Sequence, residues 1–180
     1  MSSKFERTGG ETVYEGKLAT VRIEKFRHED GEEVTREIVV HGGAVGMVAH
    51  DDEQVYLVRQ AREAIGRDDV PEIPAGLMDE PGEGALETGK RELREELGLE
   101  AENWVQATTF FSSSGFTDEV VHIFLATGLE KVGPVEDGIE LVTWPLADLD
   151  GLIDGNADAK TLIGLLWLSR ARQLGGAAGA

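Results

Sequence analysis

Hydrophobic and polar residues alternate along much of the first third of the chain, which is the pattern of half-buried β-strands. The alternation covers residues 12–16 and 18–41, and the polar stretch DGEE inside the second segment predicts a hairpin turn. Residues 43–60 repeat the arrangement, with two apolar runs on either side of the polar stretch HDDEQ. We therefore predict that this part of the chain forms β-hairpins.

The first helical pattern lies in residues 84–98, GALETGKRELREELG. Leu86, Leu93 and Leu97 share one face at 100° per residue, and Gly98 stands where a C-terminal cap is expected. The later segments are strand-like at 104–111, 119–130 and 141–145, and helical at 145–155 and 159–174. Because strands outnumber helices and do not alternate with them strictly, we predict an α+β fold with a mixed sheet between helices.

The length of 180 residues fits a single globular domain. The chain contains no internal repeat and no long linker, so we predict one domain over residues 1–174. Residues 1–42 supply its N-terminal strands, and we expect the tail GGAAGA at 175–180 to be disordered.

The net charge of −18 changes this picture by excluding whole classes of partner. So acidic a protein does not bind nucleic acid or anionic membranes non-specifically, and an anionic substrate would need a cation between itself and the protein. The absence of cysteine excludes disulfides and thiolate metal sites and fits a reducing compartment. No apolar run approaches the length of a membrane span, so we expect a cytoplasmic protein.

Three acids, Glu92, Glu95 and Glu96, crowd one arc of the predicted helix beside its leucine face. Like charges at these spacings repel by about 0.2–0.5 kcal/mol per pair. Arg91 lies one turn before Glu95 and is expected to pair with it. The spacing leaves two interpretations open: a solvated acidic face, or a site for a hard divalent cation such as Mg²⁺, which takes carboxylates together with substrate phosphates.

The segment at 70–99 resembles the Nudix box, G-x5-E-x7-R-E-U-x-E-E-x-G-U, in which U is apolar. The matching positions are Gly76, Glu83, Arg91, Glu92, Leu93, Glu95, Glu96, Gly98 and Leu99. Six residues rather than five separate Gly76 from Glu83, and the extra residue falls in the loop DEPG. Because the spacing after Glu83 is intact, the departure affects the path of the loop and leaves the acidic arc unchanged.

The resemblance implies an α/β/α sandwich in which the box forms a loop–helix–loop. It also implies hydrolysis of a nucleoside diphosphate linked to another group, with two or more Mg²⁺ or Mn²⁺ ions per site. The implied metal ligands are the main-chain carbonyl of Ala75 and the side chains of Glu92, Glu95 and Glu96. Glu83 and Arg91 are implied to hold these glutamates in place through ion pairs.

Flanking segments, EIPAGLMDE, LVRQAR and SGFTDEVVHIFLA, resemble the ADP-ribose pyrophosphatase branch of this family. In that branch the residues matching Arg36, Arg62 and Glu72 contact the substrate, some of them across a dimer interface. Ser114 stands where the branch commonly has a proline, just before the glycine matching Gly115. We include Ser114 among the expected substrate contacts, although the substitution weakens the match to ADP-ribose.

The catalytic base in this branch comes from a mobile acidic loop, which corresponds to GPVEDGIE at 133–140. Glycines on both sides of the acidic centre suit a lid. We choose Glu136 as the expected base, with Asp137 and Glu140 as alternatives. A solvated acidic turn is the other interpretation of this stretch.

Three functional hypotheses follow. The first is a Mg²⁺-dependent ADP-ribose pyrophosphatase that yields AMP and ribose 5-phosphate and forms a homodimer. The second keeps the enzyme class but replaces the substrate with a nucleotide sugar, as Ser114 indicates. The third is a non-catalytic module that binds a nucleotide metabolite, which the presence of all three glutamates disfavours.

Overall fold

The computed structural model describes residues 4–175. Its internal contacts divide the chain into two compact units. The smaller unit comprises Met1–Gly43 and Phe111–Val120, and the larger comprises Ala44–Phe110 and Val121–Ala180. The single domain expected over residues 1–174 therefore stays a prediction. Of the expected tail, residues 176–180 lie outside the described part of the chain.

The smaller unit contains a three-stranded antiparallel sheet in the order β1–β2–β3, as far as residues 4–175 show. Its strands are β1 (Phe5–Glu15), β2 (Thr20–His28) and β3 (Glu33–Val40). The predicted hairpin turn is confirmed: the His28 N–H donates to the Glu32 carbonyl (2.9 Å), and Gly31 adopts φ 88°. Only glycine takes up such a positive φ without strain, which explains the DGEE turn.

The larger unit is built on a mixed sheet with the strand order β10–β5–β4–β9–β8, to which β6 and β7 are added beside β5 and β4. Its strands are β4 (Ala44–His50), β5 (Gln54–Arg62), β6 (Arg67–Glu72), β7 (Ala75–Leu77), β8 (Leu99–Phe111), β9 (Val120–Lys131) and β10 (Glu140–Pro145). The pairing of β4 with β9 is parallel, whereas β4 and β5 pair antiparallel. The predicted mixed sheet is confirmed.

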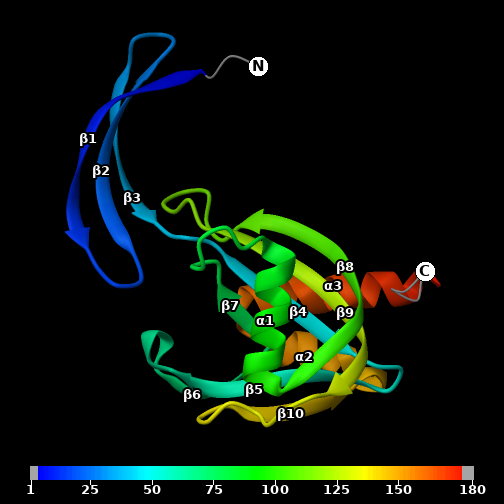
Figure 1. The fold of residues 1–180 in the computed structure, drawn as a ribbon. Helices are drawn as coiled ribbons and strands as arrows, with labels where there is room; N and C mark the ends of the chain where they lie inside the picture. The colour runs from blue at the N-terminus through cyan, green and yellow to red at the C-terminus, as the bar shows by residue number, and fades with distance from the viewer. Residues whose placement is uncertain (1–3, 176–180) are drawn as a thin grey trace. The chain divides into compact units, whose positions relative to one another are not determined.

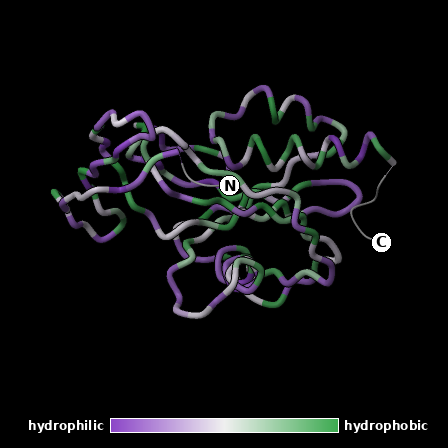
Figure 2. The backbone as a smooth tube through the Cα atoms, turned by 90° about the horizontal axis from the view of Figure 1, so that it is seen from above, coloured by the Kyte–Doolittle hydropathy of each residue, from purple (hydrophilic) through white to green (hydrophobic). Residues whose placement is uncertain are grey.

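Helices cover both faces of this sheet (Figures 1 and 2). Helix α1 (Ala85–Leu97) lies on one face, and α2 (Leu149–Gly155) and α3 (Ala159–Gln173) lie on the other. The predicted α/β/α sandwich is therefore confirmed for the larger unit. None of the helices in residues 4–175 is both long and apolar enough to cross a membrane.

Two hydrophobic clusters fill the space between the sheet and its helices. Alternation along β4 directs Val45 and Met47 into one cluster and Val48 into the other. The buried helix residues that meet them are Leu93 and Leu97 of α1, and Leu165 and Leu168 of α3. The sheet is thus buried on both sides. The packing of the α1 leucines against Val45 and Met47 fixes the position of α1 relative to β4.

Several short elements differ from the sequence-based expectation. Strands β6 and β7 and the 3-10 helix η1 (Glu63–Ile65) were not predicted. The expected C-terminal helical region is interrupted, because a 3-10 turn (Leu146–Asp148) precedes α2 and the Asp158 side chain caps the N-terminus of α3. That cap accepts a hydrogen bond from the Thr161 N–H (2.9 Å), which starts a new helix after α2 has ended.

Candidate active site

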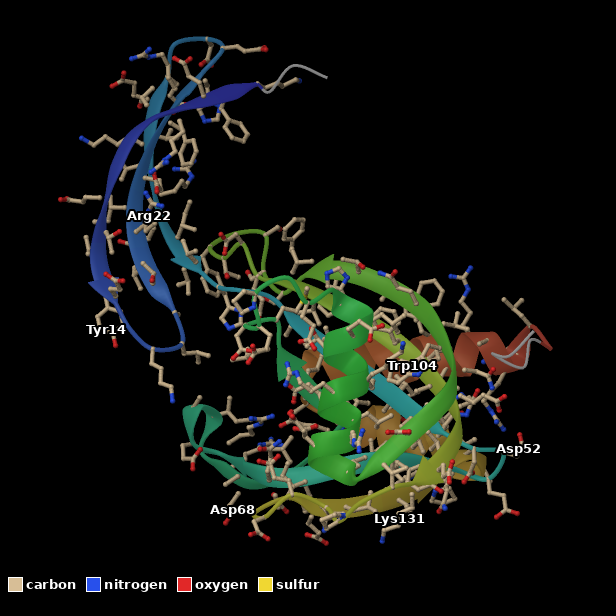
Figure 3. All side chains as sticks on the ribbon, viewed as in Figure 1. Tyr14, Arg22, Asp52, Asp68, Trp104 and Lys131 are labelled. Atoms are coloured by element: carbon tan, nitrogen blue, oxygen red, sulfur yellow. The ribbon has the colours of Figure 1, made fainter. Side chains whose placement is uncertain are left out.

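Helix α1 holds the acidic arc in place because the neighbouring leucine face is anchored in the core. Leu93 and Leu97 are fully buried, and Trp104 of β8 packs beside the helix (Figure 3). The C-terminal cap is confirmed, since Gly98 adopts φ 63° and its N–H donates to the Arg94 carbonyl (3.0 Å). This packing leaves the glutamates on the side of the helix that faces β7.

The three glutamates differ in exposure. Glu96 is buried at 7% exposure, whereas the side chains of Glu92 and Glu95 are 15% and 54% exposed. They therefore do not form a uniformly solvated acidic face. Two of the three carboxylates lie where water is scarce, and burying charge without a counter-ion is unfavourable.

Arg91 joins this arc to the loop before the helix. Its Nη1 lies 2.6 Å from Glu92 Oε1 and 3.0 Å from Glu95 Oε2, and its Nη2 lies 3.1 Å from Glu83 Oε2. The predicted pairing of Arg91 with Glu95 is confirmed. Thr88 fixes Glu83 further by donating its hydroxyl to the same carboxylate (3.0 Å). The hydrogen bond from Arg91 lowers the pKa of Glu83, which keeps that carboxylate charged.

The loop before α1 makes close contact with two of the glutamates. The Ala75 N–H donates to Glu96 Oε2 (3.0 Å). A Cβ placed on Gly76 would lie 1.9 Å from Glu92 Cδ, so only glycine leaves room for this side chain. The fixed glycine at the start of the box thus has a steric role in this structure.

The environment of Glu96 opposes its ionisation. Burial raises the pKa of Glu96 to about 7, and the charges of Glu92 and Glu136 act in the same direction. The hydrogen bond from Ala75 and the positive charge of Lys160 oppose the rise. Burial also raises the pKa of Glu92, against the effect of Arg91. A cation bound here would offset both effects.

We expect the protein in EDTA to lose stability as the pH rises from about 5 to about 8. Between the ordinary value of 4.5 and about 7, the folded protein holds a proton on Glu96 that the unfolded chain has released. This difference corresponds to a loss on the order of 3 kcal/mol. Melting temperatures measured across this range should fall with pH in the wild type and change less in Glu96→Gln. If the melting temperature of the wild type changed with pH as little as that of the variant, the proposed contribution of Glu96 would be contradicted.

The loop at 133–139 approaches the same region through its backbone. The Glu136 N–H donates to the carbonyl of Glu96 (3.0 Å). Glu140 instead lies in β10 and pairs with Arg59 (3.2 Å), and its side chain is 62% exposed. This placement favours Glu136 over Glu140 as the base, and Asp137 occupies the loop between them. The assignment of the base stays a prediction.

Arg62 and Glu72 meet in a bidentate ion pair between β5 and β6, with distances of 2.6 and 2.7 Å. Lys160 of α3, which the sequence analysis did not single out, contacts the same carboxylate. Burial alone would raise the pKa of Glu72, but hydrogen bonds from Arg62 and Lys160 outweigh it and the pKa is lowered. No local pattern points to Lys160, because its partner lies far away in the sequence.

The other expected substrate contacts, Arg36 and Ser114, belong to the smaller unit. Both line one cavity of about 280 Å³, together with Phe26, His28 and Phe116. The structure thus brings these two predicted residues to the same hollow. Their contact with substrate stays a prediction.

The donor chemistry of the arc fits a hard divalent cation, because carboxylate oxygens are the ligands that Mg²⁺ prefers. In residues 4–175, however, no three acid or histidine side chains are gathered as a ready-made metal cluster. Arg91 contacts one oxygen of Glu92 and one of Glu95, so it holds both carboxylates beside the site. Metal ligation by Ala75 and the glutamates stays a prediction.

Comparison with known proteins connects this geometry to a family. The NUDIX domain model matches residues 40–164. An ADP-ribose pyrophosphatase of Bacillus subtilis is 38% identical over 177 residues, which cover 93% of this chain and 95% of that protein. An ADP-ribose pyrophosphatase of Mycobacterium tuberculosis is 44% identical over 133 residues, which cover 73% of this chain. The match spans 64% of the mycobacterial protein.

A solved structure, a crystal structure of an ADP compounds hydrolase, matches with a TM-score of 0.83. The match covers 96% of this chain and 97% of that one, at 23% sequence identity. At this identity the likeness concerns the fold. The family model and the relatives assign the chain to a family, and this assignment agrees with the Nudix box that contains Gly76 and α1. The chain belongs to the NUDIX domain family.

Proposed function

We propose that this protein is a metal-dependent Nudix hydrolase that cleaves the pyrophosphate bond of ADP-ribose. Water adds across the P–O–P linkage, and the products are AMP and ribose 5-phosphate. The observation that carries the proposal is the set of three glutamates on α1, held by Arg91 and by the Ala75–Gly76 loop. Two relatives named ADP-ribose pyrophosphatase support the substrate.

A bound Mg²⁺ or Mn²⁺ supplies neutralisation of the diphosphate and activation of water in such a reaction. Glu92, Glu95 and Glu96, with the Ala75 carbonyl, are the groups that would hold it. We propose two or more ions per site, as the family resemblance implies. Without them, a protein of net charge −18 would repel its own substrate.

The remaining roles fall to side chains of this chain. Glu136, whose backbone is tied to Glu96, would take the proton from the attacking water. Arg62 would bind an anionic group of the substrate, since its guanidinium is partly exposed and can donate to such a group while it stays paired with Glu72. Arg36 and Ser114 would contact the substrate from the cavity of the smaller unit. We also propose that the protein is a cytoplasmic homodimer.

A substrate panel tests the assignment. Purified protein with Mg²⁺ is given ADP-ribose, an ADP-hexose and a GDP-hexose, and AMP or GMP release is measured. We expect kcat/KM for ADP-ribose to exceed that for either nucleotide sugar by about tenfold or more, since two relatives are named for hydrolysis of ADP-ribose and an enzyme discriminates between substrates by this ratio. EDTA should abolish turnover.

One observation favours a second candidate, a Nudix hydrolase that acts on a nucleotide sugar. Ser114 lines the cavity of the smaller unit at the position where ADP-ribose pyrophosphatases commonly have a proline. The same panel decides between the two, since equal or faster cleavage of a nucleotide sugar would reject ADP-ribose. Binding of ADP-ribose without turnover of any diphosphate would instead indicate the non-catalytic module.

A further inference from the structure

Glu72 is an acidic side chain that the structure places out of reach of solvent. Its side chain is 2% exposed, and both of its oxygens accept hydrogen bonds from Arg62. Lys160 occupies a further position on Oε2. Because both oxygens are buried and already accept hydrogen bonds, this carboxylate has little remaining capacity to accept a hydrogen bond from a ligand. Glu72 therefore acts on other protein groups more readily than on the substrate itself.

Lys160 is held in place by the start of α3. Its Nζ lies 3.0 Å from Asp158 Oδ2, and its side chain is 18% exposed. Asp158 also caps the helix by accepting from the Thr161 N–H and hydroxyl (2.9 and 2.6 Å). The ammonium group is thus fixed between two carboxylates, one of which belongs to a helix terminus. A lysine in such a setting is an ordered part of the structure rather than a mobile surface group.

The same segment of chain grips the neighbours of Glu72. The Asn156 side-chain amide donates to the Pro71 carbonyl (2.8 Å), and the Ile73 N–H donates to the Thr161 hydroxyl (3.0 Å). Three consecutive residues before the Nudix loop are therefore tied to the segment from Asn156 to Thr161. Among these contacts, Lys160 provides the ion pair, and its partner Glu72 is the side chain that also binds Arg62.

Arg62 is the member of this group that faces outward. Its side chain is 39% exposed. The bonds to Glu72 use Nε and Nη2, so within the described residues Nη1 is left to donate to another partner. The hydrogen bonds that Arg62 donates to Glu72 raise the pKa of Arg62, and the negative charge of Glu96 adds to that rise, so the guanidinium lies in the field of Glu96.

We propose that Lys160 is a positioning residue: by holding the Glu72 carboxylate, it fixes the Arg62 guanidinium with Nη1 directed to an anionic group of the substrate. The proposal rests on the proposed function, which supplies the diphosphate. The two positive charges of Arg62 and Lys160 balance the two negative charges of Glu72 and Asp158, so the group orients a hydrogen-bond donor and adds no net charge. Loss of the Lys160 ammonium should therefore weaken substrate binding more than it slows the chemical step.

The test compares steady-state kinetics of Lys160→Met with those of the wild type at saturating Mg²⁺. We expect KM to rise about tenfold while kcat stays within about threefold, because the lost orientation affects binding in the ground state and the transition state alike. Lys160→Arg, which keeps the cation, should restore KM to within about threefold of the wild type. Arg62→Gln combined with Lys160→Met should raise KM no further than Arg62→Gln does alone.

Two control variants separate this role from loosening of the fold. Leu168→Ala opens a cavity in the core beneath α3, where Leu168 is buried, so its melting temperature should fall while KM stays near the wild-type value. Lys131→Met changes an exposed lysine at the end of β9 (Figure 3) and should alter neither quantity. If Lys160→Met does not fold, Lys160→Gln takes its place in the same comparison.

Three results would overturn the proposal: an unchanged KM in Lys160→Met, an equal rise of KM in Leu168→Ala, or additive effects in the double variant. A shift in the Mg²⁺ concentration needed for half-maximal activity, with KM unchanged, would show that Lys160 acts on Glu96 instead. The substrate panel tests the proposed function separately from the role of Lys160. If the wild type prefers another nucleoside diphosphate, the same kinetic comparison is made with that substrate.

Discussion

Replacing Glu96 with Gln should lower kcat for pyrophosphate hydrolysis by about a thousandfold or more while the protein stays folded. The substitution keeps the size of the side chain and its acceptor for the Ala75 N–H, but it removes the charge that a divalent cation requires. Glu92→Gln should have a comparable effect. The measurement is kcat with ADP-ribose at saturating Mg²⁺, together with the melting temperature of each variant.

Glu87→Gln is the matched control on the same helix. Glu87 is 62% exposed and pairs with Lys90, outside the acidic arc. It should retain wild-type turnover, and the contrast would separate a metal role from a general effect of removing one negative charge. Near-normal turnover in both Glu92→Gln and Glu96→Gln would contradict the metal role of the arc.

Gly76→Ala should reduce kcat by about a hundredfold with little change in melting temperature. The new Cβ would lie 1.9 Å from Glu92 Cδ and 2.2 Å from Glu92 Cγ. These atoms form the far end of a flexible side chain, so the fold can adapt by moving Glu92. The displaced carboxylate would then no longer lie beside Glu96, and catalysis would suffer although packing is preserved.

Gly155→Ala provides the comparison for this substitution. Gly155 ends α2, and an added Cβ would meet no atom within 4 Å. Its kinetics should match the wild type. Equal kinetics for Gly76→Ala and Gly155→Ala would mean that the position of Glu92 is not critical, and the assignment of this residue would have to be abandoned.

Periodicity predicted the parts of this fold that combine length with a strong pattern. Helix α1 was expected over 84–98 and runs over Ala85–Leu97, because its leucines repeat at helical spacing and Gly98 ends it. Strands β6 and β7 escaped prediction. They are short, β6 contains Pro71 and β7 follows Pro74, and their pairing with β5 and β4 is decided by tertiary contacts rather than by local preference.

The site shows the same division. The box fixes Glu92, Glu95 and Glu96 to one helix, so their grouping and the pairing of Arg91 with Glu95 followed from spacing alone. The link between Lys160 and Glu72 could not be foreseen, since it joins segments 88 residues apart whose contact depends on how α3 packs. The burial of Glu72 escaped prediction for the same reason, because its carboxylate is paired with cations from β5 and α3, and charged side chains are rarely buried unless they are paired.

The parallel pairing of β4 with β9 governs the order in which this protein can fold. Ala44 lies beside Val121, so the centre of the sheet stays open until most of the chain has been synthesised. Closing so long a loop is entropically unfavourable before its contacts form, which slows collapse of the nascent chain. Until β9 has been made, β4 can pair with β5 and β7 alone, and its other edge is an exposed hydrophobic strand edge, which is a site prone to aggregation.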